Sequence, residues 1–209
     1  MRSISLAFVF CAVSVTNLTA QSRPKQLKDQ AEHDLYNQAL QPSADPARQI
    51  QSLDNWTQRY PNSEYKDDRV YMYMQAYSKL KPPEAAKVVQ LGGQLISRNL
   101  QTVFTGDSSK LVIMNVLFLV AWNAAAIPEP SANELALGQK SAQDLIAFIA
   151  NNKPENVTEQ QWAEARADIE KRAGAALLAM ALRPGGFIDI ARLPGRRAMA
   201  SNAAIERCL

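Results

Sequence analysis

Hydrophobic residues recur at helical spacing along most of the chain. In the segment 46–61, Ile50, Leu53 and Trp56 follow one another at intervals of three and Tyr60 comes one turn later, so these side chains share one side of a helix. Alternating runs of Val, Ile and aromatic residues, which would indicate strands, are absent. The pattern predicts an all-α protein with helices over 29–40, 46–60, 65–80, 84–100, 110–127, 133–151 and 158–182.

Short polar corners separate these helices. Pro61 disfavours helical backbone at Tyr60, and the residues after it favour a turn. Asp45 ahead of a proline is typical of a helix start, as are Ser131 and the capping-box sequence of 158–161. Corners this short predict three helical hairpins and an unpaired last helix, the hairpins being 29–40 with 46–60, 65–80 with 84–100, and 110–127 with 133–151.

The segment 46–100 resembles the tetratricopeptide repeat, in the divergent form of exported bacterial proteins whose repeats end in Tyr-Pro-(Asn/Asp)-Ser. The likeness rests on residues in three successive helices, namely Leu53, Trp56 and Pro61, then Val70, Tyr73, Met74 and Tyr77, then Ala86 and Gly93. Gln49 departs from the pattern, which has a small residue there. The resemblance implies a right-handed α-solenoid of antiparallel helix pairs that binds proteins or peptides and carries out no catalysis.

Composition and charge narrow the class of partner. Hydrophobic residues make up 47% of the chain and charged residues 21%, which is typical of a folded globular protein. The net charge of +3 would suit a nucleic-acid partner only if it covered the folded body. Five arginines in 183–209, against Asp189 and Glu206, give that segment alone a charge of +3. The body is therefore close to neutral, and nucleic-acid binding is not expected.

The two ends differ from the helical body, which we place at 27–182. Arg2, the apolar stretch 4–15 and the small residue Ala20 are typical of a secretory signal peptide over residues 1–20, which predicts a periplasmic or extracellular protein. An uncleaved membrane anchor is the alternative, but the apolar stretch is short for a span. Residues 183–209 lack helical spacing. They are either a disordered basic tail that touches acidic lipid or another partner, or the truncated or frame-shifted end of a longer repeat protein.

The most apolar stretch after the N-terminus is 110–127. A membrane-spanning helix is one interpretation, although Asn115 and Asn123 interrupt the stretch and it falls short of the ~20 residues that a bilayer requires. A helix that is hydrophobic on nearly all sides is more often the central helix of a repeat array, buried by its neighbours. We therefore favour a core helix over a membrane contact.

Candidate catalytic and metal-binding residues are few. His33 is the single histidine, and it lies beside Glu32 and Asp34 on a mostly polar helix side, as a solvated histidine would. The sequence 106–109 has the serine and glycine of a hydrolase corner, but no histidine follows it. Phosphate-binding and calcium-binding loop motifs are absent. The sequence predicts no enzyme activity, no cofactor and no metal.

What remains is a surface that could hold a partner. The helix 65–80 carries more aromatic and thioether side chains than one core face can bury. Tyr71 and Met72 fall outside the expected core face, which consists of Val70, Tyr73, Met74 and Tyr77. We expect Tyr71, Met72, Asn115 and Asn123 to line a groove for a protein or peptide, or else to pack inside the helical array. The prediction is an exported scaffold protein, with a membrane-tethered or accessory subunit of an envelope enzyme or secretion complex as the alternative.

Overall fold

Helix-forming sequence accounts for all the regular structure that is described. The computed structural model describes residues 25–41, 45–106 and 108–183, and within these ranges it contains helices and no strands. The predicted signal peptide and nearly all of the basic tail lie outside them. The helices are α1 (Gln30–Leu40), α2 (Pro46–Arg59), α3 (Lys66–Lys79), α4 (Ala85–Ile96), α5 (Leu100–Val103), α6 (Ser109–Ala126), α7 (Ala132–Asn151) and α8 (Glu159–Ala181). The predicted all-α class is confirmed.

The helix starts follow from the capping residues. Asp45 accepts hydrogen bonds from the backbone N–H groups of Ala47 and Arg48, at 2.9 and 3.4 Å, at the start of α2. Ser131 and Thr158 each form a capping box, at the starts of α7 and α8. These contacts satisfy backbone N–H groups that have no partner within the helix. The N-caps predicted at Asp45, Ser131 and Thr158 are confirmed.

The predicted helix 84–100 is shorter in the structure. α4 ends at Ile96, and the short helix α5 follows it. The reason is Asn99, whose φ of 52° lies in the left-handed region and turns the chain. Its side chain then accepts a hydrogen bond from the N–H of Gln101 at 3.1 Å. Asparagine tolerates the left-handed conformation and can cap the next helix with its side chain. The helical spacing of the residues around Asn99 hid this turn from the sequence analysis.

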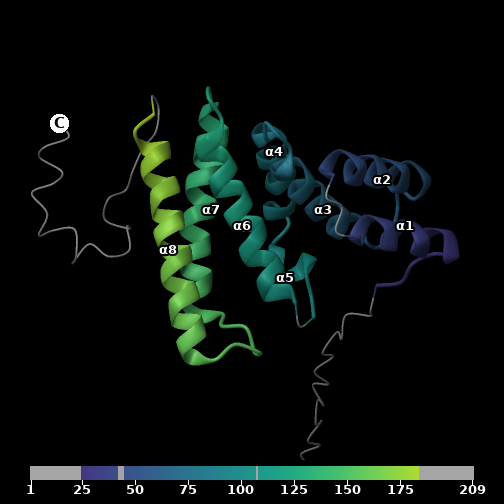
Figure 1. Ribbon diagram of the computed structural model, residues 1–209. Helices are drawn as coiled ribbons and strands as arrows, with labels where there is room; N and C mark the ends of the chain where they lie inside the picture. Colours follow the sequence, from purple (N-terminus) through teal and green to yellow (C-terminus); the bar gives the residue numbers. More distant parts are fainter. Residues whose placement is uncertain (1–24, 42–44, 107, 184–209) are drawn as a thin grey trace, which may run out of the picture.

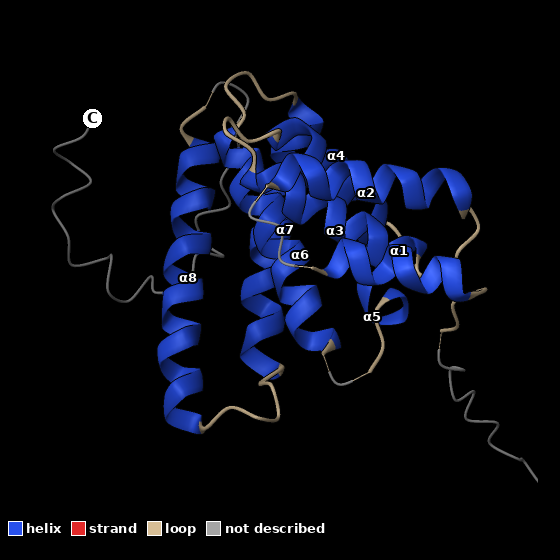
Figure 2. Cartoon of the chain, turned by 45° about the vertical axis from the view of Figure 1, so that its right-hand side comes forward, coloured by secondary structure: helices blue, strands red, loops and turns tan. Residues whose placement is uncertain are grey.

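Each of the longer helices packs against the next one along the chain. Figure 1 shows them following one another across the molecule, from α1 and α2 at one end to α8 at the other. Figure 2 shows the same helices from a second side, with α6, α7 and α8 running alongside one another. α6 occupies the middle, because it packs against α3, α4, α7 and α8. Each end of the array therefore presents a helix with neighbours on one side.

The hydrophobic core has two parts. The main cluster is centred on α6 and includes side chains from α3, α4, α7 and α8. A smaller N-terminal cluster joins α1 and α2 to α3 and consists of Leu35, Ala39, Leu53, Trp56, Tyr60 and Met72. α3 lies between them and is buried on two sides, with Met74 in the main cluster and Met72 in the N-terminal one. The prediction of a single core face for α3 was therefore incomplete, because this helix has two buried sides.

Two glycines set the closest helix contacts. A Cβ atom on Gly92 of α4 would overlap Val120 of α6 and would lie 2.9 Å from Met74 Cε of α3. A Cβ atom on Gly138 of α7 would overlap Ala124 of α6 and would lie 2.6 Å from Met180 Sδ of α8. Both glycines thus receive side chains from two neighbouring helices, which a larger residue would push away.

Candidate binding surface on α6

α6 is apolar around its whole circumference, including the side that faces solvent. Leu111, Asn115, Phe118 and Trp122 follow one another at intervals of four, three and four residues, which places them in one row along the helix. Leu111 is 54% exposed and Trp122 is 50% exposed, whereas Asn115 and Phe118 are half-buried. We call this row the α6 stripe.

An aromatic pair forms one end of the α6 stripe. The rings of Phe118 and Trp122 stack with their centroids 5.9 Å apart and their planes 15° apart. Phe118 packs against the main core, so it supports the exposed indole from one side. The stacking limits the movement of Trp122, about half of whose surface remains exposed. A rigid aromatic side chain of this kind loses little conformational entropy on binding.

A polar group adjoins the middle of the α6 stripe. Asn115 Nδ2 donates a hydrogen bond to Tyr71 Oη at 2.7 Å, and Gln75 Nε2 donates to the same oxygen at 2.9 Å. The ring of Tyr71 lies edge-on to Phe104, with 6.2 Å between centroids. Burial raises the pKa of Tyr71, so the phenol stays neutral at physiological pH. The group links α3 to α6 and offers amide and phenol atoms beside an apolar surface.

The four residues predicted to line a groove separate into two sets. The structure brings Tyr71 and Asn115 together in the hydrogen bond just described. Met72 is buried in the N-terminal cluster, with 7% of its surface exposed. Asn123 is also buried, and its Nδ2 donates to the Leu119 carbonyl of its own helix at 2.8 Å. Met72 and Asn123 therefore lie away from the surface that a partner could reach.

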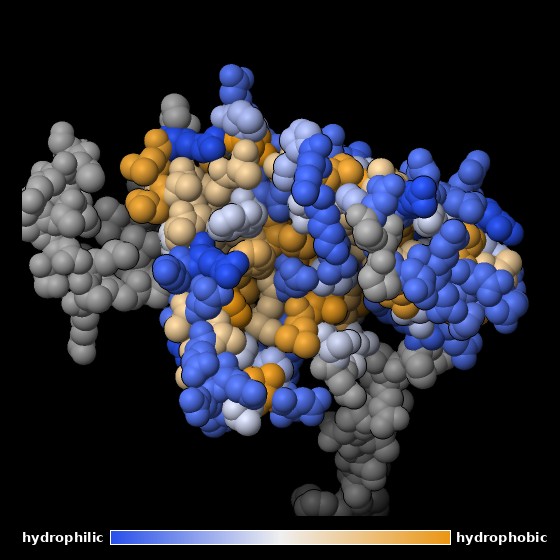
Figure 3. All heavy atoms as spheres, in the orientation of Figure 1, coloured by the Kyte–Doolittle hydropathy of each residue, from blue (hydrophilic) through white to orange (hydrophobic). Residues whose placement is uncertain are grey.

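The residues that sequence reasoning missed are Leu111, Phe118 and Trp122. Each was assigned to a buried helix because the whole stretch is apolar. A helix that packs on several neighbours in a molecule of this size still keeps an exposed side, and that side is largely apolar here. Figure 3 shows hydrophobic side chains gathered over α6 in a hollow, with hydrophilic side chains of α8 and of the N-terminal helices on either side. The missed signal was the lack of a polar side on α6.

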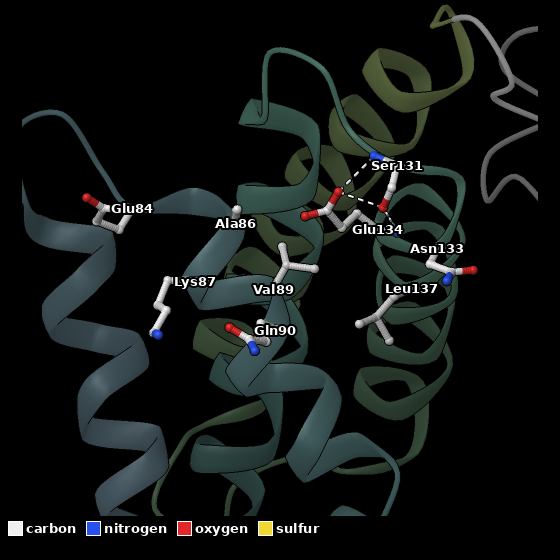
Figure 4. A pocket seen from close by; sticks show the side chains of 9 residues that line it. All are labelled: Glu84, Ala86, Lys87, Val89, Gln90, Ser131, Asn133, Glu134 and Leu137. Carbon is white, nitrogen blue, oxygen red and sulfur yellow. Dashed lines mark hydrogen bonds between the residues drawn. The ribbon is translucent and has the colours of Figure 1, made fainter.

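A second hollow lies between α4 and α7 and holds about 540 Å³. Figure 4 shows its lining, with Lys87 and Gln90 on α4 opposite Leu137 of α7. Glu134 is one of two carboxylates in the lining, and it accepts hydrogen bonds at 2.7 Å from both the N–H and the hydroxyl of Ser131. That carboxylate is thus occupied in capping α7. The hollow is wide open and offers no converging set of catalytic groups.

The ionisable groups near the N-terminus form a structural network. Glu32 is fully buried and accepts hydrogen bonds from Trp56 Nε1 at 3.1 Å and from the N–H of Lys28 at 2.6 Å. Arg69, also buried, donates to the Tyr60 carbonyl at 3.0 Å and lies over the Trp56 ring, 5.1 Å from its centroid. The contacts of Trp56 and Arg69 join α1, α2 and α3 to one another.

His33 is exposed on α1, where the side chain of Asn37 lies 3.0 Å from its Nδ1. Within the ranges that the structure describes, no three His, Cys, Asp or Glu side chains come together as metal ligands would. Comparison of the chain with known protein families, with curated proteins and with solved structures finds no match.

Proposed function

We propose that this chain is an exported, non-catalytic helical scaffold that holds a protein or peptide partner in the cell envelope. The observation that carries the proposal is the α6 stripe, where Leu111 and Trp122 each keep about half of their surface exposed. Exposed apolar groups that cluster rather than scatter are typical of interaction sites. The adjoining Tyr71, Gln75 and Asn115 add polar groups that suit a peptide backbone.

We propose further that the helices belong to a right-handed solenoid of the tetratricopeptide type. Its support is the packing of each longer helix on the next and the two glycines, Gly92 and Gly138, at which helices of neighbouring hairpins meet. In such arrays the repeated helices form a continuous surface on which an extended or helical peptide lies. The α6 stripe would be the central part of that surface.

Selection from a random peptide library tests the binding proposal. Peptides enriched on the wild-type protein should bind the variant Trp122→Ala at least about tenfold more weakly, a loss of roughly 1.4 kcal/mol. Leu40→Asp is the control, because Leu40 is exposed to a similar degree, 48%, but lies at the end of α1. Failure to enrich any peptide, or equal binding by wild type and Trp122→Ala, would exclude the α6 stripe as the site.

A membrane-tethered or accessory subunit is the second candidate, and one observation favours it. α6 is 18 residues long with a mean hydropathy of 1.5, enough by length and composition alone to cross a bilayer, while only 44% of its residues are buried. Core helices of soluble proteins meet the same criteria. Alkaline extraction of membranes from cells that express the protein separates the two candidates. Release into the supernatant supports the scaffold, and retention in the pellet supports the membrane.

A further inference from the structure

The C-terminal half of α8 is an apolar surface at the end of the helical array. All the charged residues of this helix come before Ala173, and none lies between 173 and 182. One side of this half packs on the main core through Ala173, Ala176, Leu177 and Met180. The opposite side leaves Leu178 54% exposed and Leu182 79% exposed. Figure 3 shows hydrophobic side chains at this end of α8.

Gly174 lies on the same exposed side and has no role within the chain as described. Gly92, Gly93 and Gly138 are the other described helical glycines, and a Cβ atom added to any of them would lie 3.0 Å or less from a side chain of another helix. A Cβ atom on Gly174 would meet nothing within 4 Å. Glycine in a helix interior costs roughly 1 kcal/mol relative to alanine. In this protein that cost otherwise accompanies a close helix contact, so Gly174 indicates a contact with a helix outside the described chain.

We propose that the missing helix is α8 of a second copy, so that the protein forms a two-fold symmetric dimer through this face. Gly174, Leu178 and Leu182 follow at intervals of four and form one ridge, the kind that packs against its equivalent at a crossing. The face carries both a gap, at Gly174, and an exposed side chain one turn away, at Leu178. A two-fold axis between them brings each Leu178 over Gly174 of the second copy, as an isologous interface requires.

The distribution of charge along α8 agrees with this pairing, and the short length of the apolar half limits its strength. The apolar half of α8 meets the same half of the second copy, and the charged half, from Glu159 to Arg172, projects beyond the crossing. The exposed Ala175 and Ala179 beside the ridge allow the backbones to approach closely. Ten residues of helix are only about 15 Å long. The contact is thus smaller than the ~800 Å² per partner of a stable interface, and we expect a dissociation constant of roughly tens of micromolar or weaker.

Sedimentation velocity between about 1 µM and 1 mM, with reductant present to prevent disulfides through Cys11 or Cys208, tests the proposal. The mass of the wild-type protein should rise from monomer to dimer over this range. Leu178→Asp places a charge at the crossing and should shift the transition at least about tenfold in concentration. Gly174→Leu fills the gap and should do the same. The open space around Gly174 and the 54% exposure of Leu178 favour retention of the monomer fold in both variants.

Leu40→Asp again serves as the control, since it removes a similarly exposed leucine from the opposite end of the array and should leave dimerisation unchanged. Circular dichroism verifies that all the variants keep their helices. The proposal is overturned if the wild type stays monomeric up to the highest concentration. It is also overturned if Leu178→Asp and Gly174→Leu associate as the wild type does, or if Leu40→Asp weakens association as much as they do.

Discussion

Two carboxylates near the start of α1 join the first helices through hydrogen bonds that favour their ionised forms. The hydroxyl of Tyr60 donates to Asp29 at 2.7 Å and, with the N–H of Glu32, lowers the pKa of Asp29. Burial alone would raise the pKa of Glu32, but hydrogen bonds from Ser63, the Lys28 N–H and Trp56 outweigh it and lower the pKa. Both groups therefore stabilise the fold in their charged state.

The lowered pKa values predict an acid-sensitive N-terminal hairpin. Their contribution to stability is complete when the pH is above the ordinary carboxyl pKa of about 4. It is lost as the pH falls through the lower pKa values of the folded state. We expect the free energy of unfolding to fall between about pH 5 and pH 2. Glu32→Gln should cost about 1–3 kcal/mol at pH 7 and should show a smaller loss in acid.

Urea unfolding followed by circular dichroism, at several pH values, measures this effect. Asp34→Asn is the matched control. Asp34 lies on the exposed side of the same helix, and its substitution removes one negative charge, as Glu32→Gln does. An acid profile of Glu32→Gln that parallels the wild type would show that Glu32 does not contribute in this way.

Two alanine substitutions at glycines should have opposite effects. Gly138→Ala introduces a methyl group that overlaps Ala124 and crowds Met180, and it should destabilise the protein by about 1–3 kcal/mol. Gly174→Ala meets open space in the monomer and should stabilise the helix by up to about 1 kcal/mol. Thermal unfolding at a low protein concentration, where the proposed dimer is dissociated, compares the two. If Gly138→Ala stabilised the protein and Gly174→Ala destabilised it, the packing described for α7 and α8 would be contradicted.

At the scale of the element, α6 combines a core side and an exposed side that are both apolar. The core side requires its hydrophobic residues because α6 packs on five other helices, the short α5 included. The exposed side requires none of them for folding, since Leu111 and Trp122 keep about half of their surface in water. Substitutions there should therefore separate stability from binding.

Trp122 provides a direct check on the exposure of the α6 stripe. Of the tryptophans in the chain, Trp56 and Trp162 are buried, with 0% and 9% exposed, and Trp122 is 50% exposed. We expect acrylamide to quench Trp122 and to leave the other two nearly unaffected. Trp122→Phe should remove most of the quenching while changing the free energy of unfolding by less than about 1 kcal/mol. A large loss of stability would place Trp122 in the core instead.

At the scale of the whole molecule, the two core clusters differ in size and share α3. α1 reaches the rest of the protein mainly through α2, whereas α6 is held by neighbours on several sides. Local unfolding generally begins where buried contacts are fewest. At the other end, Arg183 donates hydrogen bonds to the carbonyls of Ala125 and Pro128, both at 2.9 Å, and so ties the end of α8 to the end of α6.

Hydrogen exchange should reveal this gradient. Backbone amides of α1 should exchange fastest among the longer helices, those of α6 slowest, and those of α8 at an intermediate rate. Mass spectrometry of peptic fragments at pH 7 gives the order directly. If α1 and α6 are protected to the same extent, the two clusters unfold as one cooperative unit and the division of the core has no energetic meaning.

The sequence by itself determined the helices and most of their ends. Ile50, Leu53 and Trp56 predict α2 by their spacing, and Asp45, Ser131 and Thr158 predict where helices start, because these signals act over a few residues of the same segment. The corner at Asn99 was missed since its left-handed backbone has no unique sequence sign. The absence of alternating hydrophobic runs was sufficient for the all-α class.

The tertiary structure alone decided which side of each helix faces solvent. Tyr71 and Met72 are neighbours in sequence, yet one adjoins the α6 stripe and the other is buried against α1 and α2. α3 is covered on two sides, and the periodicity of one helix cannot tell how many neighbours it will have. The same holds for α6, whose uniformly apolar sequence does not say which of its sides is exposed, and for Gly174. Exposure depends on packing between segments far apart in the chain, and local sequence signals do not carry that information.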